Sequence, residues 1–187
     1  LAAKALIKTS RKQIRELVSQ YREKLSYTKN QQIGKSHNLL IQTTAKPSSV
    51  KIVGTQILAE INEAESVESA ANQQLIRSKI LVALRKEAKS YLPRRLSFLA
   101  KEHDFSFARS KITHSSSRWG SCSSSGTISL NIGMMNLPFE LIDYVIIHEL
   151  CHTRHMNHST KFWDEVAKFD PHYKIHRNEL KKYSPYI

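Results

Sequence analysis

Residues 148 to 158 read His-Glu-Leu-Cys-His-Thr-Arg-His-Met-Asn-His. On a helix, His148 and His152 lie four residues apart, so their imidazoles project from one face and can share a metal ion. Glu149 lies beside that face, where its carboxylate can take a proton from a metal-bound water. A catalytic zinc needs three protein ligands and one open position, and His158 can complete the set. The stretch therefore predicts a zinc site that activates water.

The third histidine determines how the chain must fold after this helix. His158 follows His152 by six residues, too far along to lie on the same helical face, so the helix must end and the chain must turn back. Asn157 suits that turn, because asparagine tolerates left-handed backbone geometry better than most residues. His155, three residues after His152, is the competing ligand. The helical pair already uses the helical geometry, which favours His158.

The residues before the motif predict the helix that carries it. Pro138 suits the first turn, and an apolar run follows, made of Phe139, Leu141, Ile142, Val145, Ile146 and Ile147. A bare His-Glu-x-x-His also occurs by chance on ordinary helices. On a buried helix, however, two imidazoles and a carboxylate cost free energy unless they are hydrogen-bonded or bind a metal. The context therefore favours the metal site.

The N-terminal part of the chain predicts one helix and a small sheet. An amphipathic helix over residues 10–25 is indicated by apolar residues at helical spacing, Ile14, Leu17, Val18 and Tyr21. Its apolar stripe should pack on the rest of the molecule. Three strand-like runs lie between residues 38 and 61, and residues 46–49 form a turn cluster among them. These runs predict a small meander.

The middle of the chain predicts a long helix. Residues 62–71 are polar and acidic and form a connector. Helical spacing then extends over residues 73–92. Proline lacks a backbone N–H and clashes with the preceding turn, so Pro93 should interrupt or kink this helix. A second helical piece should reach Glu102.

Short strands and a serine-rich loop precede the metal helix. Residues 105–107 and 111–113 alternate as strands do. Residues 115–125 have the composition of a flexible linker, but the Arg-Trp-Gly sequence at 118–120 indicates an ordered turn. Residues 127–132 predict a strand with Ile128, Leu130 and Ile132 facing inward and Ser129 and Asn131 on the other face. The residues alone leave open whether this strand lies at a sheet edge or in its interior.

Several blocks in the same order resemble a known family. They are Arg118-Trp119-Gly120-Ser121-Cys122, Ile128-Ser129-Leu130-Asn131, the metal helix, and Asn157-His158-Ser159 followed by Phe162-Trp163. Together they are similar to the YgjP-like metallopeptidases, relatives of the SprT group. The metzincin pattern is a poorer match, because it has glycine where this chain has His155 and a methionine turn that is missing after His158.

The resemblance implies a fold and a set of roles. The implied fold is an α+β, compact zincin-like metallopeptidase with a small antiparallel or mixed sheet packed on the metal-binding helix. His148, His152 and His158 would bind zinc, and Glu149 would be the general base. The resemblance also favours the edge position for the strand at 127–132, where a peptide substrate can add as a further strand. We expect a single domain over residues 1–187, with an N-terminal helix and strand region over 1–71 and a catalytic core over 72–187.

The chain is strongly basic. Its 187 residues contain 29 Lys and Arg against 16 Asp and Glu, a formal charge of +13. This balance points to polyanions or acidic substrates, although basic residues spread over helices are often only a solvated surface. SprT relatives include DNA-dependent proteases, so a surface that binds nucleic acid is one interpretation. A peptide or protein substrate is the partner we expect first; the oligomeric state is not predicted.

Cysteine content and hydropathy indicate a cytoplasmic protein. Cys122 and Cys151 provide no disulfide framework, which fits a reducing compartment. No apolar stretch is long enough to cross a bilayer, and the N-terminus lacks the apolar core of a secretory signal. The chain starts at Leu1, which leaves room for upstream residues. Cys151 should pack away from the histidine face, whereas Cys122 is an alternative zinc ligand.

The predicted reaction is metal-assisted hydrolysis of an amide bond. Glu149 takes a proton from water and returns it to the leaving amine. The group that stabilises the oxyanion stays unassigned among Arg118, Tyr144, His155 and Tyr173. Phe162 and Trp163 should anchor the returning chain, and Asp143 should lie near the helix start, away from the metal. Two alternatives are a DNA-associated protease and a non-catalytic zinc module; the open fourth position and Glu149 argue against the second.

Overall fold

The computed structural model describes residues 27–187 and shows an α+β protein with two small sheets. The predicted helix over residues 10–25 lies outside the described residues. In chain order the elements are β1 (Gln31–Ile33), β2 (His37–Thr44), β3 (Ser49–Val53), β4 (Gln56–Asn62), α2 (Ala70–Glu102), β5 (Arg109–Thr113), β6 (Gly120–Cys122), β7 (Thr127–Asn131), the short 3-10 helix η1 (Ile132–Asn136), α3 (Phe139–Cys151), α4 (Thr160–Phe169) and α5 (Tyr173–Leu180). The α+β fold class is confirmed.

The first sheet has the strand order β1-β2-β4-β3, so the predicted meander is wrong. β4 lies between β2 and β3, parallel to β2 and antiparallel to β3. The chain crosses the end of β4 before it enters β3. There Asn62 Nδ2 donates to the carbonyl of Lys46 at 3.0 Å, and Ser48 Oγ accepts from the Asn62 N–H at 2.9 Å. These long-range bonds, which no local pattern reports, hold β3 at the edge.

The long helix α2 connects the two sheets and continues through Pro93. Ser69 caps its start, because the side chain accepts a hydrogen bond from the Asn72 N–H at 3.3 Å. The predicted interruption at Pro93 is wrong, and the alternative, a kink at Pro93, stays a prediction. Leu92 and Leu96 are fully buried on either side of the proline and hold the helix in place. Lys89, whose carbonyl loses its intrahelical partner to Pro93, lies on the exposed face where water can replace that bond.

The second sheet has the order β5-β7-β6, with β7 in its centre. β7 pairs in parallel with β5 and antiparallel with β6. The expectation that residues 127–132 form a sheet edge is therefore wrong, and β6 is the edge strand on that side within the described residues. The inward alternation is confirmed, because Ile128, Leu130 and Ile132 are completely buried. Residues 105–107 are not a strand; the strand there is confined to β5.

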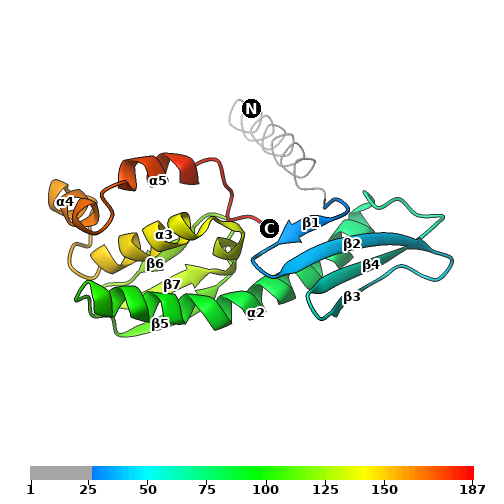
Figure 1. Ribbon diagram of the computed structural model, residues 1–187, viewed down its shortest axis with the longest axis horizontal. Helices are drawn as coiled ribbons and strands as arrows, with labels where there is room; N and C mark the ends of the chain where they lie inside the picture. The colour runs from blue at the N-terminus through cyan, green and yellow to red at the C-terminus, as the bar shows by residue number, and fades with distance from the viewer. Residues whose placement is uncertain (1–26) are drawn as a thin grey trace, which may run out of the picture.

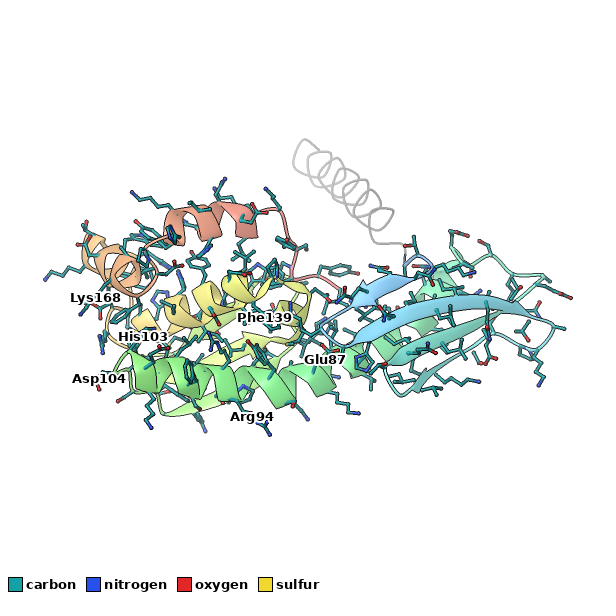
Figure 2. All side chains as sticks on the ribbon, viewed as in Figure 1. Glu87, Arg94, His103, Asp104, Phe139 and Lys168 are labelled. Atoms are coloured by element: carbon teal, nitrogen blue, oxygen red, sulfur yellow. The ribbon has the colours of Figure 1, made fainter. Side chains whose placement is uncertain are left out.

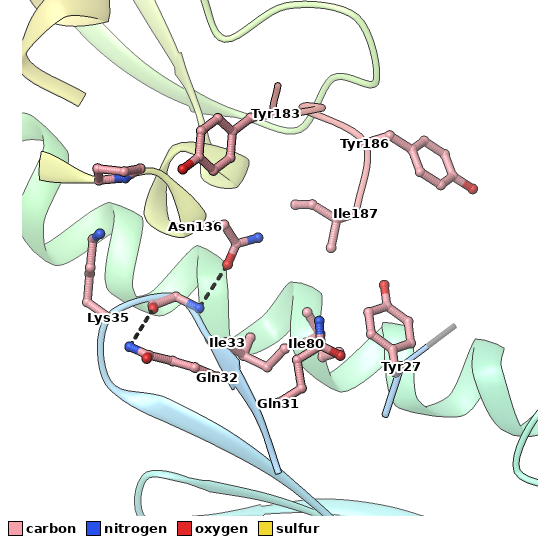
Figure 3. A pocket seen from close by; sticks show the side chains of 12 residues that line it. Tyr27, Gln31, Gln32, Ile33, Lys35, Ile80, Asn136, Tyr183, Tyr186 and Ile187 are labelled. Carbon is pink, nitrogen blue, oxygen red and sulfur yellow. Dashed lines mark hydrogen bonds between the residues drawn. The ribbon is translucent and has the colours of Figure 1, made fainter. Parts of the chain in front are cut away.

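A cluster of hydrogen bonds around Glu87 joins the first sheet to α2; we call it the joint. The Glu87 carboxylate accepts from the backbone N–H groups of Lys35 at 2.7 Å and Ser36 at 3.1 Å, and it lies 2.5 Å from His37 Nδ1. The Gly34 N–H also donates to Asn136 Oδ1 at 2.8 Å beside a cavity of about 490 Å³ (Figure 3). Figure 2 shows Glu87 where α2 passes from one sheet to the other.

The two sheets lie at opposite ends of α2 (Figure 1). α3 runs beside the C-terminal part of α2, and α4 and α5 cover α3 on the side away from α2. None of the helices in residues 27–187 is long and apolar enough to span a membrane. The division of the chain near residue 71 stays a prediction, and α2 begins at Ala70.

Candidate metal centre

The helix predicted to carry the motif is α3. Pro138 is its N-cap residue, and the apolar run that follows is buried apart from the exposed Phe139. His148 and Glu149 occupy its last turn. His152 is the C-cap residue with φ −66° and ψ −18°, which are helical values. The four-residue spacing therefore places His148 and His152 on one face, as the sequence indicated.

The chain turns back after α3 and reaches His158 just before α4. The N–H groups of Arg154 and His155 both donate to the Cys151 carbonyl, at 3.1 and 2.9 Å, which closes the end of the helix. Asn157 does not have a positive φ, so the left-handed geometry that it was expected to supply is not used. The reversal is spread over residues 153–157, and no single residue needs a left-handed conformation.

Arg154 holds this returning loop against the rest of the protein. Its guanidinium bonds the Glu165 side chain on α4 and the carbonyl of Asp104, and it lies 4.0 Å from the centre of the Phe105 ring. These contacts tie the loop between the second and third histidines to α4 and to the end of α2. The sequence prediction did not include this residue.

His148, His152 and His158 form a cluster that can hold a metal ion. Each offers one ligand atom, and these atoms lie within 4.8 Å of one another. The Nε2 atoms of His148 and His158 are 3.2 Å apart. Two nitrogens on one tetrahedral zinc, each about 2.1 Å from it, would lie about 3.4 Å apart. The spacing therefore fits zinc.

The tautomer of His152 also fits a metal ligand. Its Nδ1 lies 2.9 Å from the carbonyl oxygen of His155, which can only accept a hydrogen bond. Nδ1 must therefore carry the proton, and the lone pair on Nε2 is left for a metal. His155, the competing ligand, does not belong to the cluster that the described residues form. Only its backbone carbonyl takes part, as the acceptor of the hydrogen bond from His152 Nδ1.

Burial keeps the two helical histidines neutral. It lowers the pKa of His148 to about 3, and the neighbouring His152, His158 and Arg177 act in the same direction. Burial also lowers the pKa of His152. Metal binding requires the neutral imidazole, so this environment suits it. The Nδ1 of His148 is buried and has no hydrogen-bond partner within residues 27–187.

Glu149 follows His148 on α3 and is buried. Burial raises the pKa of its carboxyl group to about 8, and the charge of Arg118 opposes this shift. One carboxylate oxygen, Oε2, is buried without a hydrogen-bond partner among residues 27–187. An unsatisfied buried acceptor costs free energy, so this oxygen is available to accept a hydrogen bond.

The edge strand β6 presses its backbone against Glu149. A Cβ atom at Gly120 would lie 2.7 Å from Glu149 Oε1 and 2.8 Å from its Cγ, so any side chain there would displace the carboxylate. The buried side chain of Asn131 fixes the loop before β6. Its Nδ2 donates to the carbonyls of Ser115 and Arg118, both at 2.7 Å. The serine-rich loop is thus an ordered structure, as its Arg-Trp-Gly sequence indicated.

Aromatic side chains enclose the cluster on the α4 side. The ring of Phe162 is completely buried, stacks on His152 at 4.4 Å and lies within 4.9 Å of the other two imidazoles. Trp163 lies 5.6 Å from His158 and stacks on Tyr173 of α5 at 5.5 Å. The pair therefore packs the returning chain against the histidines, as predicted.

Comparison with known proteins identifies the family of the chain. A family model for the YgjP-like metallopeptidase domain matches residues 2–183. The chain belongs to the YgjP-like family. This match confirms the resemblance seen in the sequence motifs, and the family is one of metallopeptidases. No curated protein matches the chain.

Two solved structures are similar to part of this YgjP-like protein. The metallopeptidase zymogen of Pyrococcus abyssi abylysin is 26% identical, with a TM-score of 0.44 over 49% of this chain and 93% of that chain. The metallopeptidase zymogen of Methanocaldococcus jannaschii jannalysin is 20% identical, with a TM-score of 0.44 over 49% of this chain and 94% of that chain.

The structure of this YgjP-like protein also places three other residues that the sequence analysis considered, Tyr144, Asp143 and Cys122. Tyr144 is buried one turn before His148, with ring centres 6.0 Å apart, and burial raises its pKa to about 12. Asp143 bonds Arg95 on α2 at 2.7 and 2.6 Å, away from the metal side, as expected. Cys122 lies on β6 outside the histidine cluster.

One pair near the site, made of a carboxylate and an imidazole, was missed by sequence reasoning. Asp170 is buried after α4, accepts from the His172 N–H at 3.0 Å and lies 2.8 Å from His176 Nδ1. The His176 ring centre is 6.2 Å from that of Tyr144. The spacing of these residues in the sequence has no helical or strand period, so no pattern could have indicated the contact.

Proposed function

We propose that this YgjP-like protein is a zinc-dependent metalloendopeptidase. The observation that carries the proposal is the meeting of three histidine nitrogens, together with a buried glutamate that follows His148 in the chain and whose Oε2 has no partner among the described residues. His148, His152 and His158 would hold the metal. Three nitrogen ligands leave one open position, which distinguishes a catalytic zinc site from a closed structural one.

Glu149 is the proposed general base. Zinc bound by the three histidines would lower the pKa of its water and polarise the scissile carbonyl. Glu149 takes the proton of the attacking water at Oε2 and returns it to the leaving amine. The backbone of Gly120 lies against Oε1 of this carboxylate and limits its movement. Burial favours the protonated carboxyl group of Glu149 when no metal is bound. A cation held by the histidines would favour the ionised carboxylate instead.

The edge strand β6 is the proposed docking position for the peptide. It pairs with β7 on one side only within the described residues, and it contacts both Glu149 and α3. An extended peptide that adds to this edge would bring its carbonyls beside the metal cluster through backbone hydrogen bonds. This corrects the original expectation, which gave the edge to residues 127–132.

Zinc content tests the ligand set. We expect one zinc per purified chain by mass spectrometry, weakened binding in His158→Ala, and unchanged binding in the matched control His155→Ala. The control removes an imidazole from the same loop but not from the cluster. Absence of zinc from the wild-type protein, or loss of zinc in His155→Ala rather than His158→Ala, would contradict the proposed ligand set.

Cleavage of casein tests the general base. Glu149→Gln keeps the size of the side chain but cannot take the proton, so we expect cleavage to fall by about 10²- to 10⁴-fold with zinc retained. The control Glu140→Gln changes an acid in the first turn of the same helix and should cleave normally. If the wild type bound zinc but left casein and a peptide library intact, the non-catalytic zinc module would be favoured.

A second candidate function is recruitment to nucleic acid, and the exposed face of α2 favours it. Eight basic residues lie on this helix: Arg77, Lys79, Arg85, Lys86, Lys89, Arg94, Arg95 and Lys101. Its two acids are Glu87, which is buried in the joint, and Glu102 at the end. Figure 2 shows Arg94 projecting away from the molecule. Arg95 is paired with Asp143, and Arg77 and Lys79 are half-buried. The cations on the exposed surface that suit phosphate binding are therefore Arg85, Lys86, Lys89, Arg94 and Lys101.

Salt dependence tests this second candidate. Binding to a labelled duplex should weaken steeply between about 50 and 200 mM salt if several phosphates are contacted. The double variant Lys86→Gln Lys89→Gln should reduce the salt slope by about two. A salt-independent or undetectable affinity would leave the peptidase without a nucleic-acid partner.

The proposed location is the cytoplasm. Cys122 and Cys151 are both free thiols in the fold, and burial raises the pKa of Cys151 to about 12, which keeps it unreactive. Two unpaired thiols fit a reducing compartment. Fractionation of cells that produce the tagged protein tests this; recovery with membranes or in the medium would contradict it.

A further inference from the structure

Two arginines flank the metal centre without a carboxylate partner. Arg118 lies in the loop before β6, and Arg177 lies on α5. Both side chains are exposed, and neither forms a salt bridge anywhere in residues 27–187. An exposed guanidinium with no partner in its own chain can bind a carboxylate of a ligand, often through two parallel hydrogen bonds.

The backbone of Arg118 is fixed next to Glu149. Asn131 Nδ2 donates to the Arg118 carbonyl at 2.7 Å, and the Asn131 N–H donates to the carbonyl of Trp119 at 2.9 Å. Gly120, two residues after Arg118, lies against the Glu149 carboxylate. The charge of Arg118 reaches Glu149, where it favours the ionised form. Arg118 therefore stands on the β6 side of the metal centre.

Arg177 stands at the opposite side. Its guanidinium lies over the ring of Trp163, with 4.5 Å between Cζ and the ring centre. The Trp163 ring centre is in turn 5.8 Å from that of His148 and 5.6 Å from that of His158. One aromatic ring thus separates Arg177 from the metal ligands. Figure 1 shows α5 and β6 on different sides of α3.

Apart from Glu149, the acids near these arginines are already engaged or turned away. Asp170 bonds His176 and the His172 backbone, and Glu165 bonds Arg154. Asp164 is exposed on α4, about half a turn from the buried Phe162 and Val166, and so faces away from the cluster. Apart from Glu149 itself, these neighbouring acids leave the positive charges of Arg118 and Arg177 uncompensated at the metal centre.

We propose that the metal centre selects peptides with acidic side chains close to the scissile bond, which Arg118 and Arg177 bind from the two sides of α3. This inference rests on the proposed peptidase function and adds a substrate class to it. The overall charge of +13 points the same way, because it raises the local concentration of acidic peptides. Peptides with lysine or arginine at these positions are repelled by the same two groups.

Peptide binding to a zinc-loaded Glu149→Gln protein tests the preference without requiring cleavage. Three fluorescein-labelled decapeptides are compared by anisotropy, identical except for four central residues that are all Glu, all Ala or all Lys. We expect the Glu peptide to bind most tightly and the Lys peptide most weakly. Arg118→Gln and Arg177→Gln should each weaken the Glu peptide about five- to tenfold and change the Ala peptide less than about twofold.

Control variants separate the two arginines from the general charge of the protein. Lys181→Gln removes the same charge at the end of α5 and should leave the preference intact. Arg177→Glu should reverse part of the preference toward the Lys peptide. A preference that disappears instead in Lys86→Gln Lys89→Gln would place the peptide on α2 and overturn the proposal.

Two further results would also overturn it. Equal affinities for the three peptides would show that the metal centre does not discriminate between peptides by their charge. Equal losses for all three peptides in Arg118→Gln and Arg177→Gln would show that the arginines support the fold or the peptide backbone and not acidic side chains. If the wild type cleaved casein but bound the three decapeptides equally well, this inference would be overturned and the peptidase function would stand.

Discussion

Two buried glutamates, Glu87 in the joint and Glu149 in the metal centre, have opposite surroundings. Glu87 receives two backbone N–H groups and lies 2.5 Å from His37. Glu149 lies beside His148 and has one oxygen with no partner in the described part of the chain. Both carboxylates are almost excluded from solvent, with 9% and 6% of each residue exposed. A buried glutamate next to a histidine therefore occurs at both places, and the hydrogen bonds of the carboxylate distinguish the two.

The difference identifies which carboxylate is available for chemistry. A buried carboxylate with a full set of donors is stabilised and has no reason to change partners. A buried carboxylate with an open acceptor is costly to the free protein, and a ligand that satisfies the acceptor recovers that cost. The joint is thus expected to hold the fold, and the metal centre is expected to work at the expense of stability.

Each glutamate is also touched by a glycine. A Cβ at Gly34 would lie 2.3 Å from Glu87 Oε2, and a Cβ at Gly120 would lie 2.7 Å from Glu149 Oε1. The two contacts have the same form but different consequences. Substitutions at the four positions should therefore divide into effects on stability and effects on catalysis.

The largest expected effect is the pH dependence of the metal-free protein. Burial raises the pKa of Glu149 to about 8, from about 4.3 in the unfolded chain. Below pH 4 the group is protonated in both states, and its contribution to stability is fully present. As pH rises from about 4.5 to 8, the unfolded state ionises first and the contribution of Glu149 to the free energy of unfolding falls by roughly 3 to 5 kcal/mol. His148, whose pKa is lowered to about 3, contributes in the opposite direction up to about pH 6.5. Urea unfolding at several pH values, compared between the wild type and Glu149→Gln, measures the Glu149 contribution.

Glu149→Gln provides the control for this pH effect. The variant cannot ionise at this position, so the loss between pH 4.5 and 8 should be smaller than in the wild type by the same amount. Adding zinc to the wild type should also reduce the loss, because a cation beside the carboxylate favours its ionised form. Parallel pH profiles for wild type and variant would show that Glu149 is not held protonated in the free protein.

Glu87→Gln should have the next largest effect, and on stability alone. The amide group would place a donor against one of the N–H groups and would remove the charge opposite His37. Because the site is buried, we expect the free energy of unfolding to fall by about 3 kcal/mol. Zinc content and cleavage per folded molecule should stay at the wild-type level. The exposed Glu102→Gln, at the end of the same helix, is the matched control and should change little.

The sequence predicted the parts of the metal centre that are local. The four-residue spacing of His148 and His152, the apolar run before them and the need for a chain reversal before His158 all follow from helical geometry. The three histidines do meet in the structure. The zinc itself and the role of Glu149 stay predictions, now with geometry that favours them.

The parts that sequence reasoning missed depend on contacts between distant residues. His37 and Glu87 are 50 positions apart, and Gly120 and Glu149 are 29 positions apart in the chain. The insertion of β4 between β2 and β3 rests on bonds between Asn62 and the 46–48 connection. Pro93 was overestimated as a helix breaker, because packing of the residues around it outweighs one lost hydrogen bond.

Gly120→Ala should reduce catalysis and leave the metal in place. The added methyl group would push the Glu149 carboxylate aside, since that side chain is more easily moved than the backbone of β6. A displacement near 1 Å at a reacting group costs up to about 100-fold, so we expect kcat to fall about 10- to 100-fold with unchanged zinc content. Ser121→Ala, the next residue of β6, is the control. Loss of zinc in Gly120→Ala would mean that β6 supports the ligands and not the base.

Gly34→Ala should have the smallest effect, on stability and not on cleavage. Gly34 has φ of +62°, and its added methyl group would meet Glu87 Oε2 and, at 2.9 Å, a methyl carbon of Leu84. Left-handed geometry costs a non-glycine residue about 1 to 2 kcal/mol, and the collision adds to it. We expect the free energy of unfolding to fall by about 2 kcal/mol or slightly more, with cleavage per folded molecule unchanged.

Gly54→Ala separates the two parts of this effect. Gly54 has a nearly identical φ of +60° but nothing within 4 Å of an added Cβ, so it measures the backbone cost alone. The difference between the two variants is the contribution of the Glu87 contact, and it should shrink when Glu87 is first replaced by alanine. If Gly34→Ala instead lowered kcat at constant stability, the joint would influence the metal centre, and the division between a structural and a reactive glutamate would fail.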